Sequence, residues 1–266
     1  MDDHSTDGSW EILEGYAKKD ARFKIVKRPN DRKKGGNAAR NYAFELSTGE
    51  FINWVDSDDI LVPCKLEKQL NQIVLTNSDI VLGKIENSDD RLPIRNFIFE
   101  TNKNKRPIKF LKGDFWFQTS VPLFTRVFLL SMDSMFSENL VRNQEGEFFT
   151  RILLKKPEIS FINEVMVFRV FDENSIFARY KLLKPNEKIK LDYPVFSMFP
   201  KLFQSSMLWD DESKEYFVNW YIRVVQEAEF NFIEFSKLFY LTFLYGSNYQ
   251  RWIFVKSIVY TLLTKH

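Results

Sequence analysis

Residues 35–63, GGNAARNYAFELSTGEFINWVDSDDILVP, decide the fold of this chain. The first part predicts a helix with one apolar face, because apolar side chains recur there at helical spacing. They are Ala38, Ala39, Tyr42, Ala43 and Leu46. Residues 47–49, Ser-Thr-Gly, end this helix, and Gly49 is expected to provide a left-handed cap. The next run, residues 51–55, is short and mostly apolar, which predicts a strand buried on both faces and central in a sheet.

An acidic corner, Asp-Ser-Asp-Asp at residues 56–59, follows this strand directly. Ligands of open parallel sheets bind just past the carboxyl ends of the strands, so three carboxylates are expected at a ligand site. Asp56 and Asp58 are two residues apart, and their oxygens can converge on one hard divalent cation such as Mg²⁺ or Mn²⁺. A solvated acidic turn is the alternative interpretation. A calcium loop of the EF-hand type fits poorly, because Ile60 and Leu61 stand where polar and glycine positions are needed.

Helix and strand patterns alternate on both sides of this stretch and predict a mixed α/β domain. The expected elements are helices over 10–17 and 66–75, strands over 23–27 and 79–85, and a closing hairpin of residues 159–162 and 165–170. Residues 87–112 are polar and poorly periodic, which predicts a loop region with short strands.

Composition excludes several classes of protein. The 266 residues include 38 Lys and Arg against 36 Asp and Glu, and a net charge of +2 argues against a dedicated nucleic-acid binder. Cys64 is the single cysteine, so an internal disulfide and a cysteine-based zinc site are excluded. No run of 18 or more apolar residues suggests a spanning helix. The 27 phenylalanines exceed what a core requires, and part of them is interpreted as interaction surface.

Three segments, in this order, resemble the family 2 glycosyltransferases, which have the GT-A fold. Residues 2–9, DDHSTDGS, are similar to the family's D-D-G/N-S-T-D-x-S element. Residues 35–43, GGNAARNYA, match its G-x-x-x-A-R-N-x-G/A segment, and residues 56–59 match its acidic D-x-D-D strand end. The resemblance implies an α/β fold of GT-A type, with a Rossmann-like mixed sheet flanked by helices and, here, a helical C-terminal extension.

The resemblance also implies a donor site. Asp3 matches the carboxylate that contacts the nucleotide base, and a carboxylate can accept a hydrogen bond from the ring N–H of uracil or the amino group of guanine. The alternative is that Asp3 and its neighbours cap the next helix. Arg40 matches a family position close to the acidic corner, and it is assigned to donor binding together with Asp56. Asp58 is the expected main metal ligand, assisted by Asp56, for Mg²⁺ or Mn²⁺ that bridges the donor diphosphate.

A second acidic segment, residues 143–151 (NQEGEFFTR), resembles the family's E-D-x-E-F-x-x-R element. Glu145 falls on the position of the general base of inverting transfer, as Glu instead of the usual Asp. A base must lie within hydrogen-bond reach of the acceptor hydroxyl, and a glutamate can do this with a longer arm. The alternative is an acid favoured by the helix dipole at a helix N-terminus. Glu147 and Arg151 also match the family element.

The acceptor side of the cleft is expected around residues 115–126. Trp116 is a candidate to stack on a sugar ring, with burial in the core as the alternative. From residue 180 the character changes to long segments rich in Phe, Tyr and Leu, interrupted by charges. They predict helices around 195–208, 214–228, 230–245 and 252–263, with Pro200 breaking or kinking the first. These helices pack on the first domain or, alternatively, lie on a membrane face.

The resulting hypothesis is a glycosyltransferase domain over residues 1–179 and a helical region over 180–266. It would move a sugar with inversion from a nucleotide-diphosphate sugar to a hydroxyl of a saccharide or lipid-linked acceptor, in polysaccharide or glycoconjugate synthesis. The hypothesis also includes a cytoplasmic location, with peripheral contact at the inner face of the membrane as an option. The competing hypotheses are a non-catalytic binding protein that keeps the fold and, as a weaker option, a nucleotidyltransferase.

The N-terminus departs from the family pattern. In the family, a strand, a helix and a second strand precede the element at residues 2–9, and such a unit takes about 30 residues. The chain as given begins with that element. The expectation from this difference is a weak or inactive transferase that an upstream strand-helix-strand segment would restore.

Overall fold

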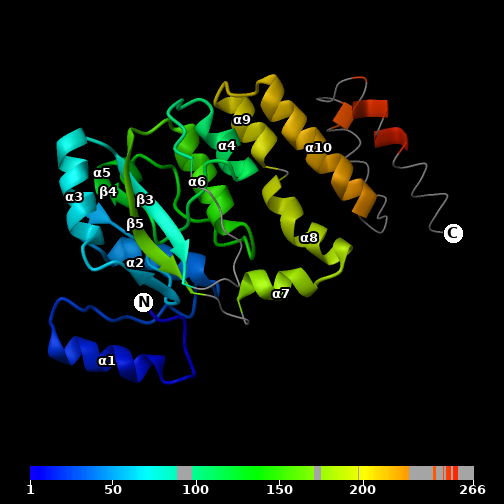
Figure 1. Ribbon diagram of the computed structural model, residues 1–266. Helices are drawn as coiled ribbons and strands as arrows, with labels where there is room; N and C mark the ends of the chain where they lie inside the picture. Colours follow the sequence, from blue (N-terminus) through cyan, green and yellow to red (C-terminus); the bar gives the residue numbers. More distant parts are fainter. Residues whose placement is uncertain are drawn as a thin grey trace. The chain divides into compact units, whose positions relative to one another are not determined.

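The computed structural model divides into two compact units, residues 1–103 with 109–171 and residues 104–108 with 172–266 (Figure 1). The described residues are 1–88, 98–170, 175–196, 198–227, 242–243, 248, 250–252 and 254–256. The predicted boundary between residues 179 and 180 stays a prediction.

The first unit is built on a five-stranded mixed sheet with the strand order β1-β4-β3-β5-β2. The strands are β1 (Phe51–Ile52), β2 (Asp59–Leu61), β3 (Ile80–Asn87), β4 (Leu123–Thr125) and β5 (Ile159–Arg169). β3 and β5 pair in parallel, and all other pairs are antiparallel. The predicted mixed α/β class is therefore confirmed.

The strand at residues 51–55 is not central, as the sequence predicted, but lies at one end of this strand order. Its regular part, β1, pairs with β4 alone among the described strands. The prediction of burial is correct for Ile52 and Trp54, which belong to the main core, whereas Val55 is exposed. The apolar composition of this segment correctly predicted burial, but not a central place in the sheet. Residues that pack on the face of the sheet bury Ile52 and Trp54, although β4 is the only described strand beside β1.

β5 is one continuous strand, where the sequence predicted a hairpin. It runs parallel to β3 from Ile80 opposite Ile159 to Asn87 opposite Arg169. The register shifts near Gly83, and the two exposed residues 163–164 are accommodated as an irregularity instead of a turn. A side chain at Gly83 would collide with Met166, so this position requires glycine.

Six of the described helices belong wholly or mainly to the first unit. They are α1 (Ser9–Lys19), α2 (Gly36–Leu46), α3 (Lys65–Thr76), α4 (Arg106–Lys112), α5 (Arg126–Leu130) and α6 (Gln144–Leu154). The helices predicted over 10–17, 38–46 and 66–75 are confirmed.

Three local predictions were wrong. Residues 106–112 form α4 instead of a loop. Residues 23–27 make a single parallel bridge, between Lys27 and Asp2, instead of a strand. The residue that caps α2 is Ser47, which is extended, and Gly49 does not have a positive φ, so the predicted left-handed cap at Gly49 is absent.

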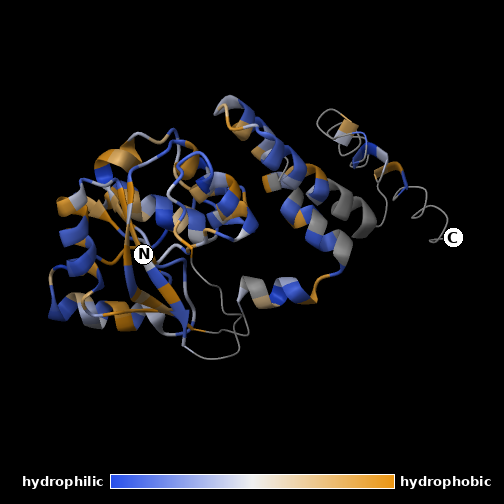
Figure 2. Cartoon of the chain, turned by 45° about the horizontal axis from the view of Figure 1, so that its top comes forward, coloured by the Kyte–Doolittle hydropathy of each residue, from blue (hydrophilic) through white to orange (hydrophobic). Residues whose placement is uncertain are grey.

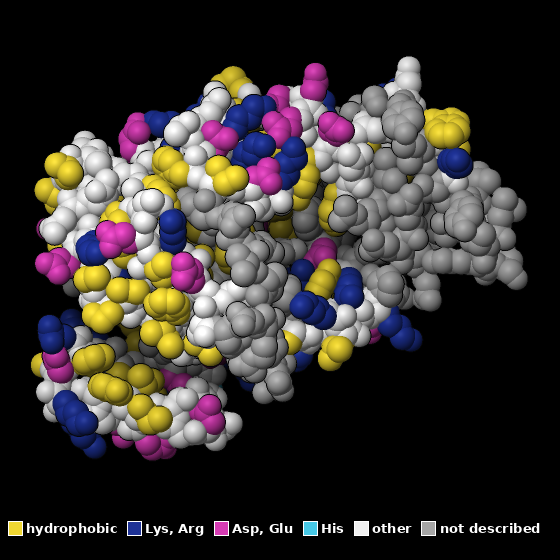
Figure 3. Space-filling view, viewed as in Figure 1, with side chains coloured by type: hydrophobic (Ala, Val, Ile, Leu, Met, Phe, Trp, Pro, Cys, Tyr) yellow, Lys and Arg dark blue, Asp and Glu magenta, His cyan; other side chains and the backbone are white. Residues whose placement is uncertain are grey.

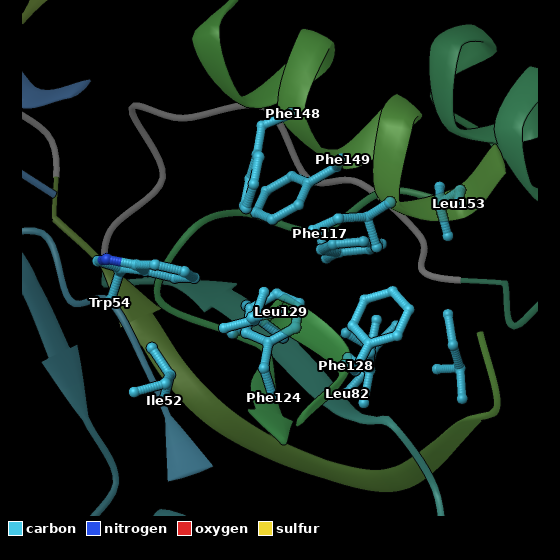
Figure 4. Packing of buried hydrophobic residues seen from close by; sticks show 14 of the residues in the cluster. Ile52, Trp54, Leu82, Phe117, Phe124, Phe128, Leu129, Phe148, Phe149 and Leu153 are labelled. Atoms are coloured by element: carbon cyan, nitrogen blue, oxygen red, sulfur yellow. The ribbon is translucent and has the colours of Figure 1, made fainter. Parts of the chain in front are cut away.

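Aromatic side chains fill the core between the sheet and α6 (Figure 4). Phe148 and Phe149 point from α6 toward Phe117 and the strands, and Trp54 packs edge-on against Phe124 and Phe148. Among the phenylalanines whose side-chain burial is described, only Phe23 and Phe243 are exposed. The excess of phenylalanine therefore builds the core in the described part of the chain, and its interpretation as interaction surface is wrong there. Hydrophobic colour accordingly follows the strands in Figure 2.

The second unit is helical. Its described helices are α7 (Ile176–Leu182), α8 (Pro185–Phe196), α9 (Phe199–Ser205) and α10 (Asp211–Glu227). The predicted break at Pro200 is confirmed, because this residue lies in the first turn of α9. The helices predicted over 230–245 and 252–263 fall largely outside the described residues. Within the described part, no helix is both long enough and apolar enough to cross a membrane.

Candidate active site

An ion pair between Arg40 and Asp56 joins the two segments that the sequence singled out first. The Arg40 guanidinium on α2 donates to Asp56 Oδ1 over 2.5 Å, and both side chains are partly exposed. Trp54 Nε1 donates to the Arg40 carbonyl at 3.2 Å, which fixes the helix against the segment leading to Asp56. The structure thus brings two predicted donor-site residues together.

Glu145 lies in the first turn of α6 and accepts hydrogen bonds from Thr119. The Thr119 amide donates to Glu145 Oε1 at 2.7 Å, and the Thr119 hydroxyl donates to the same oxygen. Burial raises the pKa of the Glu145 carboxyl, and the charge of Asp56 raises it further. The bonds from Thr119 and the charge of Arg40 act in the opposite direction. Glu145 therefore shares one electrostatic environment with the Arg40–Asp56 pair.

The two motif residues beyond Glu145 have a structural role. Glu147 is buried and forms an ion pair with Arg151 one turn later on α6. Arg151 also donates to the carbonyls of Ser134 and Met135, which ties the helix to the preceding loop. These contacts hold α6, and with it Glu145, in place.

Ser120, next to Thr119, contacts the acidic corner. Its hydroxyl oxygen accepts from the Asp56 amide at 3.0 Å and also bonds the Asp59 carboxylate. Burial raises the pKa of Asp59 to about 6, and the charges of Asp56 and Asp58 add to this effect, while the Ser120 bond opposes it. Two consecutive residues thus hold the two acidic groups of the site: Thr119 holds Glu145 and Ser120 holds the acidic corner.

Asp3 is fixed by polar contacts with Arg28 and Gly35. Its carboxylate pairs with the buried Arg28 and accepts from the Gly35 amide at 2.9 Å. Gly35 has a φ of 131°, a conformation that side chains rarely adopt, so glycine is required where this amide turns toward Asp3. Asp3 does not cap α1, because Gly8 is the N-cap residue and Asp7 bonds the Ser9 amide. The contact of Asp3 with a nucleotide base stays a prediction.

Trp116 is half-buried against the main core, between the buried Phe115 and Phe117. The Arg169 guanidinium lies over its ring at 5.8 Å. Arg169 also acts electrostatically on Asp59, so Trp116 lies in the neighbourhood of the acidic corner. The predicted stacking on an acceptor sugar stays untested by these contacts.

No group of three or more His, Cys, Asp or Glu side chains in the described residues forms a complete metal site. The donor set nevertheless suits Mg²⁺ or Mn²⁺, because two or three carboxylates from residues 56–59 offer hard oxygen ligands. Mg²⁺ typically takes one or two carboxylates and completes its shell with substrate phosphates and water. The residues therefore fit a metal that arrives together with a diphosphate.

Sequence reasoning missed Thr119 and Ser120, which lie in a loop without periodicity. Their small hydroxyl side chains give no signal in the sequence alone. It also missed Lys65, for which a signal exists: Lys65, Gln69 and Ile73 are four residues apart on α3 and share its buried face.

The model of the family described as Glycosyl transferase family 2 matches residues 1–139. An uncharacterized glycosyltransferase of Haemophilus influenzae is 37% identical over 97 residues, which cover 35% of this chain and 38% of that protein. A poly(ribitol-phosphate) beta-glucosyltransferase of Bacillus spizizenii is 27% identical over 184 residues, which cover 69% of this chain and 27% of that protein. The alignments therefore span less than half the length of these two relatives.

Among solved structures, residues 1–349 of S. aureus TarS in complex with UDP-GlcNAc have a similar fold. The TM-score is 0.62 at 18% identity, over 97% of this chain and 78% of that one. This likeness supports the GT-A fold.

Proposed function

Because the chain belongs to glycosyl transferase family 2, we propose that it transfers a sugar from a nucleotide-diphosphate sugar to an acceptor hydroxyl with inversion. The observation that carries this proposal is the convergence of Glu145, Asp56 and Arg40 from three separate segments. A half-buried carboxyl next to a charged donor-binding pair suits a reaction that needs a base on one side and an anion site on the other.

The donor side is assigned to Arg40, Asp56 and Asp58, with Asp3 at the nucleotide base. Asp58 and Asp56 would hold Mg²⁺ or Mn²⁺, which neutralises charge on the leaving nucleoside diphosphate. Arg40 keeps the Asp56 carboxylate oriented through their ion pair. S. aureus TarS was solved with UDP-GlcNAc, and this supports a uridine-diphosphate sugar as the first donor to test.

The acceptor side is assigned to Glu145 and Trp116. The Glu145 carboxylate takes the proton of the acceptor hydroxyl as the hydroxyl oxygen attacks the anomeric carbon. The bond from that carbon to the diphosphate oxygen breaks on the opposite face, so the configuration inverts. Burial raises the pKa of Glu145, which makes its carboxylate a stronger base, while the bonds from Thr119 keep it oriented.

The acceptor class and the setting follow from the relatives. The name of the Bacillus spizizenii protein, a poly(ribitol-phosphate) glucosyltransferase, supports a growing polysaccharide or glycoconjugate as the acceptor, saccharide or lipid-linked. We assign the catalytic domain to residues 1–179 and a helical accessory region to 180–266. A cytoplasmic site of action is included in the proposal, where nucleotide sugars are made, with peripheral contact at the membrane.

The test measures nucleoside diphosphate released from a panel of UDP- and GDP-sugars, with Mn²⁺ or Mg²⁺ and simple saccharide acceptors. Glu145→Gln should lower the turnover roughly 100- to 1,000-fold while the chain stays folded, since general-base catalysis is worth that much. Glu215→Gln, which removes an exposed charge from α10, is the matched control and should leave the rate unchanged. Nucleotide binding without turnover by the wild-type chain would favour the non-catalytic hypothesis.

Removal of divalent metal provides the second arm of this test. Chelation with EDTA should abolish transfer, and added Mn²⁺ should restore it, because the carboxylates of residues 56–59 otherwise face the diphosphate uncompensated. Full activity in EDTA would remove the metal from the proposal and leave Arg40 as the cation of the donor site.

A further inference from the structure

A buried ammonium group, that of Lys65, bonds Asn53, three residues before the acidic corner. Lys65, at the start of α3, has 0% of its surface exposed. Its Nζ donates to Asn53 Oδ1 at 3.0 Å and to Gln69 Oε1 at 2.7 Å. Both acceptors are neutral amides, and burial lowers the pKa of Lys65 to about 8. Charge neutralisation by a carboxylate therefore does not explain why a lysine is buried at this position.

The two amides pass this interaction on to backbone carbonyls, one of them on β3, where Gln69 Nε2 donates to Val81, and three in one loop. Asn53 Nδ2 donates to the carbonyl of Ser120 at 3.3 Å and to that of Pro122 at 2.8 Å. Gln69 Nε2 donates to the carbonyl of Val121, which lies between them, at 2.9 Å. Three consecutive carbonyls are thus held by two side chains. Because each amide oxygen accepts from Lys65, each amide must turn its NH₂ group toward the loop.

The loop held in this way carries the two residues that grip the acidic groups of the site. Thr119 bonds Glu145, and Ser120 bonds Asp56 and Asp59. Ser120 belongs to the held backbone of residues 120–122 and Thr119 directly precedes it, so the positions of both side chains depend on this backbone. A shift of this backbone would move the base and the donor carboxylates relative to each other.

We infer that Lys65 is a positioning residue: its Nζ orients Asn53 and Gln69, which fix residues 120–122 and thereby align Glu145 with Asp56. This inference rests on the proposed function for its effect on catalysis, although the network itself does not. A neutral amine still has two N–H donors, one for each amide oxygen, so the network survives loss of the proton from Lys65. A methionine of similar length fills the space but donates nothing.

The first experiment compares Lys65→Met with Lys68→Met, a matched control on the same helix whose lysine is partly exposed and paired with Glu164. Lys65→Met should lower kcat roughly 10- to 100-fold, as expected for misalignment of reacting groups, with donor affinity changed less than about 2-fold. The acid limb of its pH–rate profile should move to higher pH, because weaker bonds from Thr119 raise the pKa of Glu145. Lys68→Met should change none of these.

A readout that needs no turnover separates this inference from the proposed function. Hydrogen exchange measured by mass spectrometry should become faster in Lys65→Met for peptides covering residues 53–59 and 115–123, while peptides from α6 stay as in the wild type. Faster exchange in Lys65→Met, together with a wild-type chain that shows no transferase activity, would reject the proposed function but support the hydrogen-bond network. Unchanged exchange in these peptides would overturn the inference, whatever the activity.

A double-mutant cycle with Asn53→Ala tests whether Lys65 acts through the amide. The two effects on kcat should be far from additive, because both substitutions release the Ser120 and Pro122 carbonyls that Asn53 holds. Lys65→Gln, which keeps an N–H donor, should recover part of the rate and replaces Lys65→Met if the latter does not fold. Additive effects, or a Lys65→Gln variant as slow as Lys65→Met with normal stability, would contradict a positioning role.

Discussion

Helices α1 and α6 each have eleven residues and one apolar face, yet different interactions hold them in place. Seven residues of α6 are buried, whereas none of α1, which the structure describes in full, is buried. In α1, Ile12 and Tyr16 expose 62% and 52% of their surface, and Figure 3 shows hydrophobic side chains gathered over this helix. The segments flanking α1 are held by main-chain bonds of Asp2 to Val26 and Arg28 and by the polar contacts of Asp3.

This difference divides the candidate site into two parts. Glu145 is positioned by a helix locked in an aromatic core, and Asp3 by an ion pair and one amide. Helical periodicity of apolar residues predicted α1, whereas the sequence suggested α6 only through the alternative interpretation of Glu145 as an acid at a helix N-terminus. Helix formation follows local sequence, while burial depends on what packs against the helix. The base side of the site should therefore be rigid and the nucleotide side sensitive to single polar contacts.

The largest expected effect comes from the packed helix. Phe148→Ala should lower the free energy of unfolding by about 3–5 kcal/mol, because it leaves a cavity among the core aromatics. Ile12→Ala, on the exposed face of α1, should cost no more than about 0.5 kcal/mol. Urea denaturation of both variants measures these losses in the free energy of unfolding. Similar losses in the two would show that α1 is packed in solution and would end the comparison.

A smaller effect is expected where polar contacts act alone. Asp3→Asn removes the negative charge beside the buried Arg28, and this should cost about 1–3 kcal/mol of stability. The apparent KM for a nucleotide-sugar donor should also rise, by roughly 10-fold if the carboxylate contacts the base. Asp7→Asn, an exposed carboxylate of the same segment, serves as the control. An unchanged KM in Asp3→Asn would remove Asp3 from the donor site.

The smallest effect concerns Asp59, whose pKa of about 6 exceeds its usual value of 3.8. The folded chain keeps a proton on Asp59 that the unfolded chain releases, so this group's contribution to stability falls as the pH rises from about 4 to about 6. Asp59→Asn should equal the wild type near pH 4 and exceed it by about 1 kcal/mol at pH 7 without divalent metal, after allowance for solvent screening. Denaturation at both pH values tests the sign. A wild type more stable than the variant at pH 7 would mean that Asp59 is stabilised as a carboxylate.

Local sequence signals predicted α1, α2, α3 and the acidic corner well, but they missed α4. They failed for β1 and β5, because strand neighbours are chosen by segments far away in the chain. Phe51 pairs with Thr125, more than 70 residues later, and no pattern within residues 51–55 reports that partner. Residues 163–164 resemble a turn in composition, but continued pairing with β3 keeps the strand extended through them.

The candidate site shows the same division. Asp56 and Glu145 were found because their motifs resemble a family, and the structure places them in one electrostatic environment. The residues that hold them, Thr119 and Ser120, gave no signal, because a hydroxyl in a loop has no periodicity. Lys65 could have been found, since a lysine four residues before Gln69 on a buried helix face requires an explanation.

The strand order also determines when the acidic corner can form during synthesis of the chain. Residues 53–58 join β1 to β2, which lie at opposite ends of the strand order, and β2 pairs with Val167, Phe168 and Arg169. These partners are made more than 100 residues after the corner itself. On a ribosome that adds residues from the N-terminus, Asp56 and Asp58 therefore emerge before β2 can pair, because β2 requires that residue 169 has left the exit tunnel. The proposed donor carboxylates are therefore made well before the strand that completes the sheet on their side.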